Sequence, residues 1–239
     1  MVWDWVPRNS GLILGLLGEH VVLAFVPVAI GLVAAVPVGW LANRDARTRA
    51  VLIPAASLLY TIPSLALIIM LPAVLGTLTL DPLNIVAALT IYTVALLVRS
   101  VADALAAVPP AVVAAATAMG YRAIRRFLTV ELPLAVPVLV AGLRVATVSN
   151  ISLVSVGALI GVGGLGGLFT DGYQRDFPTE ILTGIVLTVL LALAADLTLL
   201  GMGRLAAPWQ RAGGTALGAP RPVAVGGAGA GTGGAGGAG

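Results

Sequence analysis

Residue types that carry out covalent or metal chemistry are scarce in this sequence. Its 239 residues include no cysteine, ten acidic residues and a single histidine, His20. The lack of cysteine excludes disulfides, thiolate nucleophiles and thiolate metal sites, and a single histidine excludes a multi-histidine metal site. The carboxylates form no convergent catalytic cluster. We therefore expect no catalytic residue, no metal ion and no cofactor.

The glycine-rich stretch GVGGLG, residues 161–166, has the spacing of a dinucleotide-binding fingerprint. Such a fingerprint binds a pyrophosphate only where it joins a strand to a helix and an acidic residue follows in a second strand. The surrounding sequence offers no such βαβ unit. We expect the glycines to bend irregular backbone inside the protein, at a tight turn or a gate. No GxxxxGKS or GxxxxGKT motif occurs, so the sequence contains no Walker A site for binding ATP.

Three ionisable residues lie within or beside apolar stretches. Asp196 lies in ALAADLTLL, and Arg144 is its only obvious counter-charge inside such a stretch. Because an unpaired charge is costly in hydrocarbon, we hypothesise that these two side chains form an ion pair. His20 follows Glu19 just before an apolar stretch, and we expect an interfacial or capping residue there in preference to a proton relay.

The elements that position these residues are apolar helices. Of the 239 residues, 59% are hydrophobic and 10% are charged, and the mean hydropathy is +1.06. Soluble domains have roughly half apolar residues, and a water-soluble fold could not bury this excess. The composition therefore predicts an all-α integral membrane protein.

About twenty apolar residues cross a bilayer as one helix. Five stretches meet this requirement: residues 21–41, 51–75, 83–101, 134–155 and 181–202. The second contains three prolines, and broken helices survive in a membrane only where protein or a water-lined cavity satisfies the freed carbonyls. We expect it to face the protein interior. Residues 12–17 are too short to span and are predicted to form an interfacial helix, anchored by Trp3 and Trp5.

Arginine content predicts the orientation of these helices. Arginine is concentrated after the first, third and fifth stretches, for example at Arg44, Arg122 and Arg204. The opposite connections carry acidic residues such as Asp81 and Glu180. Since cytoplasmic loops carry the excess positive charge, we predict an N-terminus outside and a C-terminus in the cytoplasm. The arginines form no basic stripe, so nucleic acid is not an expected partner.

The longest polar interruption, residues 102–133, lies on the predicted cytoplasmic side. Pro110 is expected to open a helix of small residues, and Gly120 to end it. A basic amphipathic helix is predicted over residues 121–130, stopping before Pro133. Two short helices joined at a glycine form a rigid knob that the surface of another protein can approach closely.

This segment resembles the cytoplasmic signature of the permease subunits of binding-protein-dependent ABC importers. The signature is Glu-Ala-Ala, three residues, Gly, nine residues, then Ile-x-Leu-Pro, and the chain has Ala114-Ala115-Ala116, Gly120 and Val130-Glu131-Leu132-Pro133 at this spacing. Ala114 replaces the signature Glu, and Val130 replaces the Ile. Further stretches resemble the branch that imports the osmoprotectants glycine betaine, choline, carnitine or proline betaine: YTIPSLAL at 60–67, VRS at 98–100, ELPLAVP at 131–137, AGLR at 141–144 and IGVGGLG at 160–166.

The resemblance implies a multi-pass permease of a bacterial plasma (inner) membrane that works by alternating access. Its partners would be a cytoplasmic ABC ATPase dimer, a second permease subunit, an extracytoplasmic substrate-binding protein and the lipid bilayer. We expect an N-terminal segment 1–20, a permease domain 21–205 and a disordered Gly/Ala-rich tail 206–239. The resemblance assigns seven residues to coupling with the ATPase: Ala114, Ala115, Ala116, Gly120, Arg122, Leu132 and Pro133.

Polar and aromatic side chains within the stretches are candidates for a translocation path. Hydroxyl and aromatic contacts would pass a quaternary ammonium without trapping it, although Ser and Thr often bond to their own helix backbone. The candidates for path or gate are Tyr60, Thr61, Pro63, Ser64, Tyr92, Ser149, Asn150, Gly163 and Gly164. Two alternatives remain: a permease for methionine or another amino acid, and a secondary transporter or channel.

Overall fold

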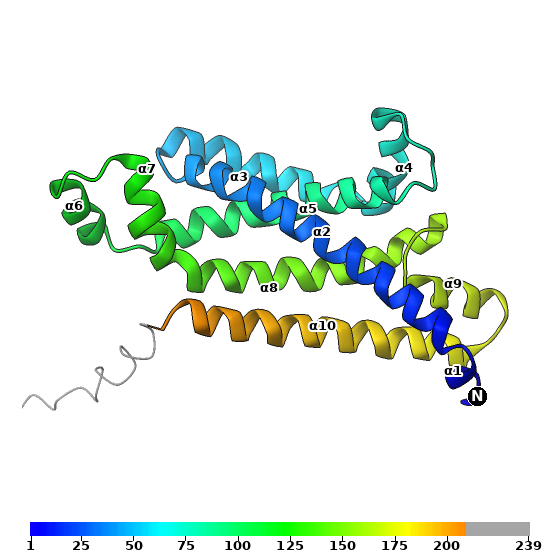
Figure 1. Cartoon of the computed structure of the whole chain (residues 1–239). Coiled ribbons are helices and arrows are strands. Elements are labelled where there is room, and N and C mark those ends of the chain that lie inside the picture. Colours follow the sequence, from blue (N-terminus) through cyan, green and yellow to red (C-terminus); the bar gives the residue numbers. More distant parts are fainter. Residues whose placement is uncertain (209–239) are drawn as a thin grey trace, which may run out of the picture. The chain divides into compact units, whose positions relative to one another are not determined.

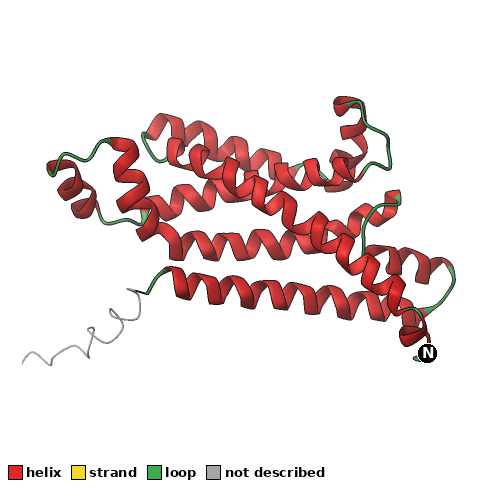
Figure 2. Cartoon of the chain, in the orientation of Figure 1, coloured by secondary structure: helices red, strands yellow, loops and turns green. Residues whose placement is uncertain are grey.

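The computed structural model describes residues 1–208, which are helical over most of their length and contain no strand (Figure 2). The helices are α1 Trp5–Arg8, α2 Ser10–Ala42, α3 Ala46–Thr61, α4 Ser64–Leu75, α5 Pro82–Ala106, α6 Pro110–Ala118, α7 Ala123–Arg126, the π-helix η1 Phe127–Glu131, α8 Leu132–Gly157, the 3₁₀ turn η2 Ala158–Ile160, α9 Gly166–Gln174 and α10 Pro178–Ala206. The predicted disorder of the tail beyond residue 208 lies outside the described residues.

Four helices of the described region are long and apolar enough to cross a bilayer, or five when α3 and α4 are taken as one broken span. The predicted all-α membrane fold with about five spans is confirmed. Figure 1 shows α8 and α10 lying side by side and α2 crossing the bundle. It also shows α6 and α7 at the end of the bundle opposite to α1 and α9, so the two sets of short elements are separated by the length of the spans.

Helix α2 is longer than the sequence predicts. It runs without a break from Ser10 to Ala42, so the separate interfacial helix predicted at residues 12–17 is wrong. The reason is that spanning helices tolerate both glycine and proline, so neither Gly11, Gly15 and Gly18 nor Pro27 and Pro37 interrupt the helix. Trp5, expected as a headgroup anchor, packs edge-on against Phe177 with ring centroids 5.7 Å apart.

The second predicted span is broken. Helices α3 and α4 meet at 98°, because Ile62 and Pro63 both adopt extended backbone conformations. Pro63 has no backbone N–H and cannot continue the hydrogen bonds of α3, so α3 ends before it. Pro63 is then the N-cap residue of α4. Within this chain only Ala56, Ile68 and Leu71 of the two helices are buried. The expectation that this span faces the protein interior and not lipid stays a prediction.

Helices α2 and α5 approach closely because small residues recur on α2 at intervals of four. Gly31, Ala35 and Gly39 lie in the contact, and a Cβ atom on Gly39 would be 2.5 Å from the Cβ of Val101. Spanning helices associate through such small-residue faces, since lipid provides no hydrophobic driving force for helix association. The buried side chains around this contact form two clusters along α2, α5 and α8.

Replacing a glycine of this contact tests the importance of the close approach. We expect Gly39→Ala to lower the free energy of unfolding by about 1–3 kcal/mol, because the added methyl group overlaps Val101. Gly15→Ala is the matched control on the same helix, since a Cβ there meets nothing within 4 Å. Thermal unfolding in detergent measures both variants. Equal melting temperatures would contradict the packing.

Candidate functional site

The first helix predicted in the 102–133 segment, and the turn that ends it, are present. Pro109 precedes α6 as its N-cap residue, and α6 ends at Ala118. The amide of Tyr121 donates to Ala116 O at 3.1 Å, and that of Gly120 to Thr117 O at 3.0 Å. This is the Schellman arrangement, which needs a left-handed residue, and Gly120 supplies it with φ +83°. The predicted break at Gly120 is confirmed.

The predicted stop before Pro133 is wrong. Helix α7 passes through the wide π-turn of η1 directly into α8, so that one continuous helical path extends from Ala123 to Ile160. A π-turn widens the helix by one residue per turn. Pro133 comes directly after this π-turn, whose i→i+5 hydrogen bonds interrupt the regular i→i+4 ladder that a proline cannot join, and the helix therefore continues past it.

An ion-pair network joins α6 to the start of α8. The Nε of Arg126 donates to Glu131 Oε1 at 2.6 Å, and its Nη1 donates to Thr117 Oγ1 at 2.7 Å. The side chain of Glu131 is 7% exposed, so its charge is desolvated and depends on this partner. Neither Arg126 nor Glu131 was predicted as a coupling residue, and the bond that Arg126 also makes to Thr117 of α6 is visible only in the fold.

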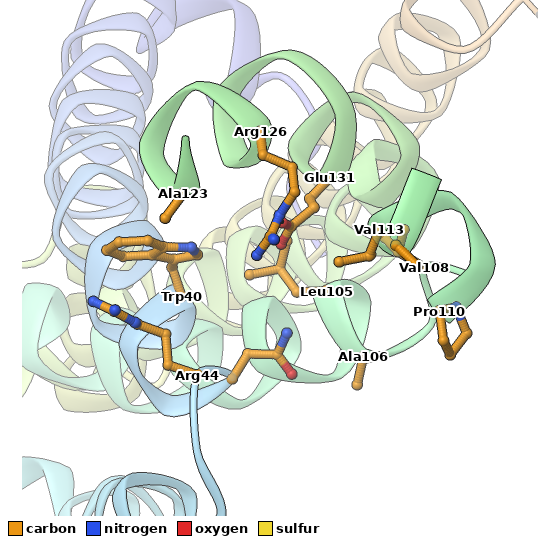
Figure 3. A pocket seen from close by; sticks show the side chains of 12 residues that line it. Trp40, Arg44, Leu105, Ala106, Val108, Pro110, Val113, Ala123, Arg126 and Glu131 are labelled. Atoms are coloured by element: carbon orange, nitrogen blue, oxygen red, sulfur yellow. The ribbon is translucent and has the colours of Figure 1, made fainter. Parts of the chain in front are cut away.

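A cavity of about 600 Å³ lies beside this network, where the ends of α2 and α5 meet α6 and α7. Figure 3 shows Arg126 and Glu131 pointing toward one another at its wall, and Trp40 beside Arg44. The guanidinium of Arg44 lies 5.2 Å from the Trp40 ring centroid, a cation–π distance. Trp40 also packs against the aromatic ring of Phe127, with ring centroids 5.3 Å apart.

The predicted coupling residues differ in their exposure to solvent. Ala114, Ala115, Gly120 and Arg122 are exposed, whereas Ala116 is buried and Leu132 and Pro133 are half-buried. Met119 and Ile124 also expose apolar side chains on this part of the chain, and sequence analysis missed both. An exposed patch that combines small, apolar and basic side chains is suited to contact with another protein.

Aromatic residues gather where the second span breaks. The hydroxyl of Tyr92 on α5 donates to Ile62 O, the carbonyl freed by the break. The Tyr60 ring packs edge-on against Tyr92, with centroids 5.7 Å apart, and is 45% exposed. A groove of about 270 Å³ continues from Tyr60 past Ser57, Arg99 and Ser100. The structure thus brings together three residues of the predicted translocation path: Tyr60, Pro63 and Tyr92.

The hydroxyl groups near the break have different surroundings. Thr61 is exposed, and its hydroxyl donates to Leu58 O of its own helix at 2.7 Å. Ser64 is half-buried as the first residue of α4. The Thr61 hydroxyl therefore bonds to the backbone of its own helix, as Thr hydroxyls in helices generally do.

Asn150 and the two glycines lie inside the protein rather than on an open path. Asn150 on α8 is 2% exposed and donates from Nδ2 to Thr93 Oγ1 on α5 at 2.8 Å. Gly163 and Gly164 are buried, and Gly163 packs against Ala158. These residues hold elements together in this conformation, because their polar atoms or backbones face protein.

The hypothesised ion pair between α8 and α10 is confirmed. Arg144 donates to both carboxylate oxygens of Asp196, from Nε at 2.7 Å and from Nη2 at 2.6 Å. The two side chains are 31% and 26% exposed and line a groove of about 460 Å³ together with Ser149. A bidentate pair fixes both the distance and the orientation of two helices, so it sets how α10 lies on α8.

His20 is not the interfacial residue that the sequence suggested. Its side chain is completely buried in α2, with ring nitrogens near Ile151 O and the amide of Leu165. Sequence analysis missed it because these partners lie more than a hundred residues further along the chain. Within residues 1–208, no group of three or more His, Cys, Asp and Glu side chains could hold a metal ion.

Comparison with known proteins places residues 28–211 in a family model described as binding-protein-dependent transport system inner membrane component. The osmoprotectant import permease protein OsmW of Salmonella typhimurium is 33% identical over 191 residues, which cover 79% of this chain and 88% of that protein. The choline transport system permease protein OpuBD of Bacillus subtilis is 29% identical, over 85% of this chain and 89% of its own.

The fold is also similar to a solved structure. An inward-facing conformation of the MetNI methionine ABC transporter superposes with a TM-score of 0.76 at 24% identity. The match covers 83% of this chain and 98% of that chain. At this level of identity the similarity establishes the fold alone.

The Arg144–Asp196 pair can be tested by a double-mutant cycle. Arg144→Gln or Asp196→Asn alone leaves one charge without its partner, and each should lower the melting temperature. The double variant removes both charges and should be more stable than the worse single variant. Thermal unfolding in detergent measures all four proteins. Strictly additive losses would argue against the pair.

Proposed function

Because the chain belongs to the family of binding-protein-dependent transport system inner membrane components, we propose that it carries quaternary-ammonium osmoprotectants such as glycine betaine, choline or carnitine. It is an inner-membrane permease subunit of an ABC importer and not itself an enzyme. Permeases of this family work with an ATPase and a substrate-binding protein. The substrate class and the roles of individual residues are parts of the proposal.

The observation that carries the substrate class is the aromatic pair at the break of the second span. Tyr60 exposes much of its ring beside Tyr92, above a groove that also contains Ser57, Ser100 and Arg99. A quaternary ammonium has no N–H to donate, so aromatic faces attract it without hydrogen bonds. The Arg99 guanidinium, which also lines the groove, suits the carboxylate of a betaine. Relatives named for osmoprotectant and choline transport agree with this chemistry.

Coupling to ATP hydrolysis is proposed at the exposed face of α6. An ATPase that contacts Ala114, Ala115 and Gly120 would push on α6, and the Arg126 network would carry the displacement to Glu131 at the base of α8. The continuous helical path from α7 into α8 supports this route, because it connects the 102–133 segment to a spanning helix without an intervening loop. The spans would then alternate between two access states.

A second permease subunit is proposed to cover α3 and α4. Both helices leave apolar side chains exposed, with Leu58 at 68% and Val74 at 74%. Backbone freed by a bend at membrane depth is tolerated only where protein or a water-filled cavity covers it. A partner on this side would complete the lining of the path around Tyr60. It would be an identical or a related permease.

An amino-acid importer, for example for methionine, remains the second candidate. The similarity to the methionine transporter supports the shared fold, and a TM-score of 0.76 does not distinguish substrates. An amino acid carries a primary ammonium with three N–H donors, which needs oxygen acceptors in place of aromatic faces. The Tyr60–Tyr92 arrangement therefore favours the quaternary-ammonium class.

Uptake by cells at high salt tests the substrate class. Cells that produce the intact chain with its partner subunits should accumulate labelled glycine betaine or choline, and a deletion should abolish this uptake. Excess unlabelled osmoprotectant should compete, whereas excess methionine should not. Normal accumulation in the deletion strain, with no redundant system present, would exclude osmoprotectants. Competition by methionine alone would favour the amino-acid importer.

Gly120 provides a separate test of the coupling site. Gly120→Val forces a β-branched residue into the left-handed region, at a cost of roughly 1–2 kcal/mol or more, and should distort the end of α6. Gly120→Asn is the matched control because Asn tolerates this conformation. We expect the Val variant to lose uptake and ATPase co-purification while the Asn variant keeps both. Full activity of both variants would remove the coupling role and leave the substrate proposal intact.

A further inference from the structure

His20 makes two hydrogen bonds to backbone groups of distant segments. Its Nε2 lies 2.9 Å from Ile151 O on α8, and the amide of Leu165 donates to its Nδ1 at 3.2 Å. A carbonyl can only accept and an amide can only donate, so these two contacts together require a neutral imidazole with its hydrogen on Nε2. The side chain is 0% exposed, which leaves no water to replace either bond.

The loop that His20 contacts lies directly on the helices. A Cβ atom on Gly164 would be 2.7 Å from the N and Cα of His20, and Gly164 has φ +50°. On the other side of the loop, a Cβ on Gly166 would be 2.8 Å from the Cα of Ser155 on α8. Backbone thus packs on backbone, and the glycines are required both for space and for conformation.

Such close packing leaves few partners for the polar groups of the loop. The side chain of Leu165 is completely buried, and its amide precedes α9, where a helix cannot satisfy the first amides itself. An unpaired buried amide is costly, so the hydrogen bond to His20 is what keeps this peptide seated. Because Leu165 leads into Gly166, the same bond determines where α9 begins.

We propose that His20 is a positioning residue that seats the 161–166 loop on α2 and α8 through its Nδ1 atom, and that import depends on this seating. The second part rests on the proposed function, since α9 and the loop lie at the end of the spans opposite to the 102–133 segment (Figure 1). There they border the predicted external side, at which substrate would enter.

Three substitutions of His20 separate the two hydrogen bonds from simple packing. His20→Asn places an amide oxygen one bond beyond Cγ, as Nδ1 is, and can accept from Leu165. His20→Gln places its amide nitrogen near the position of Nε2 and can replace only the bond to Ile151. His20→Phe fills the ring volume and makes neither bond. A packing role predicts that Phe is tolerated best and Asn worst, because Asn leaves a cavity; the positioning role predicts the reverse.

Thiol labelling reports the position of the loop directly. The chain contains no cysteine, so Val162→Cys introduces a single thiol at a position that is 7% exposed when the loop is seated. The full-length Val162→Cys protein is combined with each His20 variant, purified in detergent, and treated with a hydrophilic maleimide. We expect labelling to accelerate about tenfold or more with Phe and Gln, and to stay near the parent rate with Asn.

Gly164→Ala in the same background is an independent variant, because its methyl group would push the loop away from α2 while His20 is intact. It should label as fast as His20→Phe. Slow labelling of both would overturn the proposal, as would fast labelling of Asn together with slow labelling of Gln and Phe.

Uptake by the same variants, without the Val162→Cys change, tests whether import depends on the seating of the loop. We expect His20→Phe and His20→Gln to lose uptake and His20→Asn to retain it. Equal uptake by all three variants would overturn this dependence. The labelling rates do not depend on which solute is carried. A chain that imports another solute would therefore fail the uptake test with osmoprotectants and still show the predicted order of labelling.

Discussion

Side chains that bond to freed backbone groups support this bundle at three of its breaks. Where α3 ends, Tyr92 donates to Ile62 O. Where α4 leads into α5, Asn84 donates to Leu78 O at 2.8 Å. Where α8 gives way to the glycine loop, His20 accepts from the Leu165 amide. Without water in the hydrocarbon region, an irregular peptide persists only if protein satisfies it, so these contacts make the broken helices compatible with a membrane.

Small residues make those contacts reachable. Gly31 and Gly39 let α2 approach α5, and Gly142 lets α8 approach Ser100 of α5. At such distances a short side chain spans from one helix to the next, as Asn150 does to Thr93. Larger residues would separate the helices and leave these polar groups without partners.

Helix α8 connects the two ends of the molecule where function is proposed. Its first turn follows Glu131 and the Arg126 network, and its last residue, Gly157, packs against Val162 of the glycine loop. Between them, the Arg144–Asp196 pair fixes α10 to the same helix. A displacement of α6 would therefore be carried along α8 to the loop and to α9. This arrangement gives alternating access a single spanning helix, α8, through which both ends of the molecule are connected.

The sequence by itself determined the features that depend on neighbouring residues. Composition and apolar length predicted the membrane class and its spans, proline placement predicted the breakable second span, and Gly120 predicted the end of α6. The pairing of Asp196 with Arg144 was also predictable, because a charge in hydrocarbon has few possible partners. The orientation in the membrane and the coupling and path roles stay predictions.

Only the tertiary structure decided which side chains act across the fold. His20 reaches partners 131 and 145 residues away, so its local context suggested a border residue although it is completely buried. Asn150 is packed against Thr93, and the helix continues past Pro133 through a π-turn. Local patterns fix helix formation, which is a property of neighbouring residues. Long-range contacts depend on how closely whole helices pack, and a single sequence does not encode that distance in any local signal.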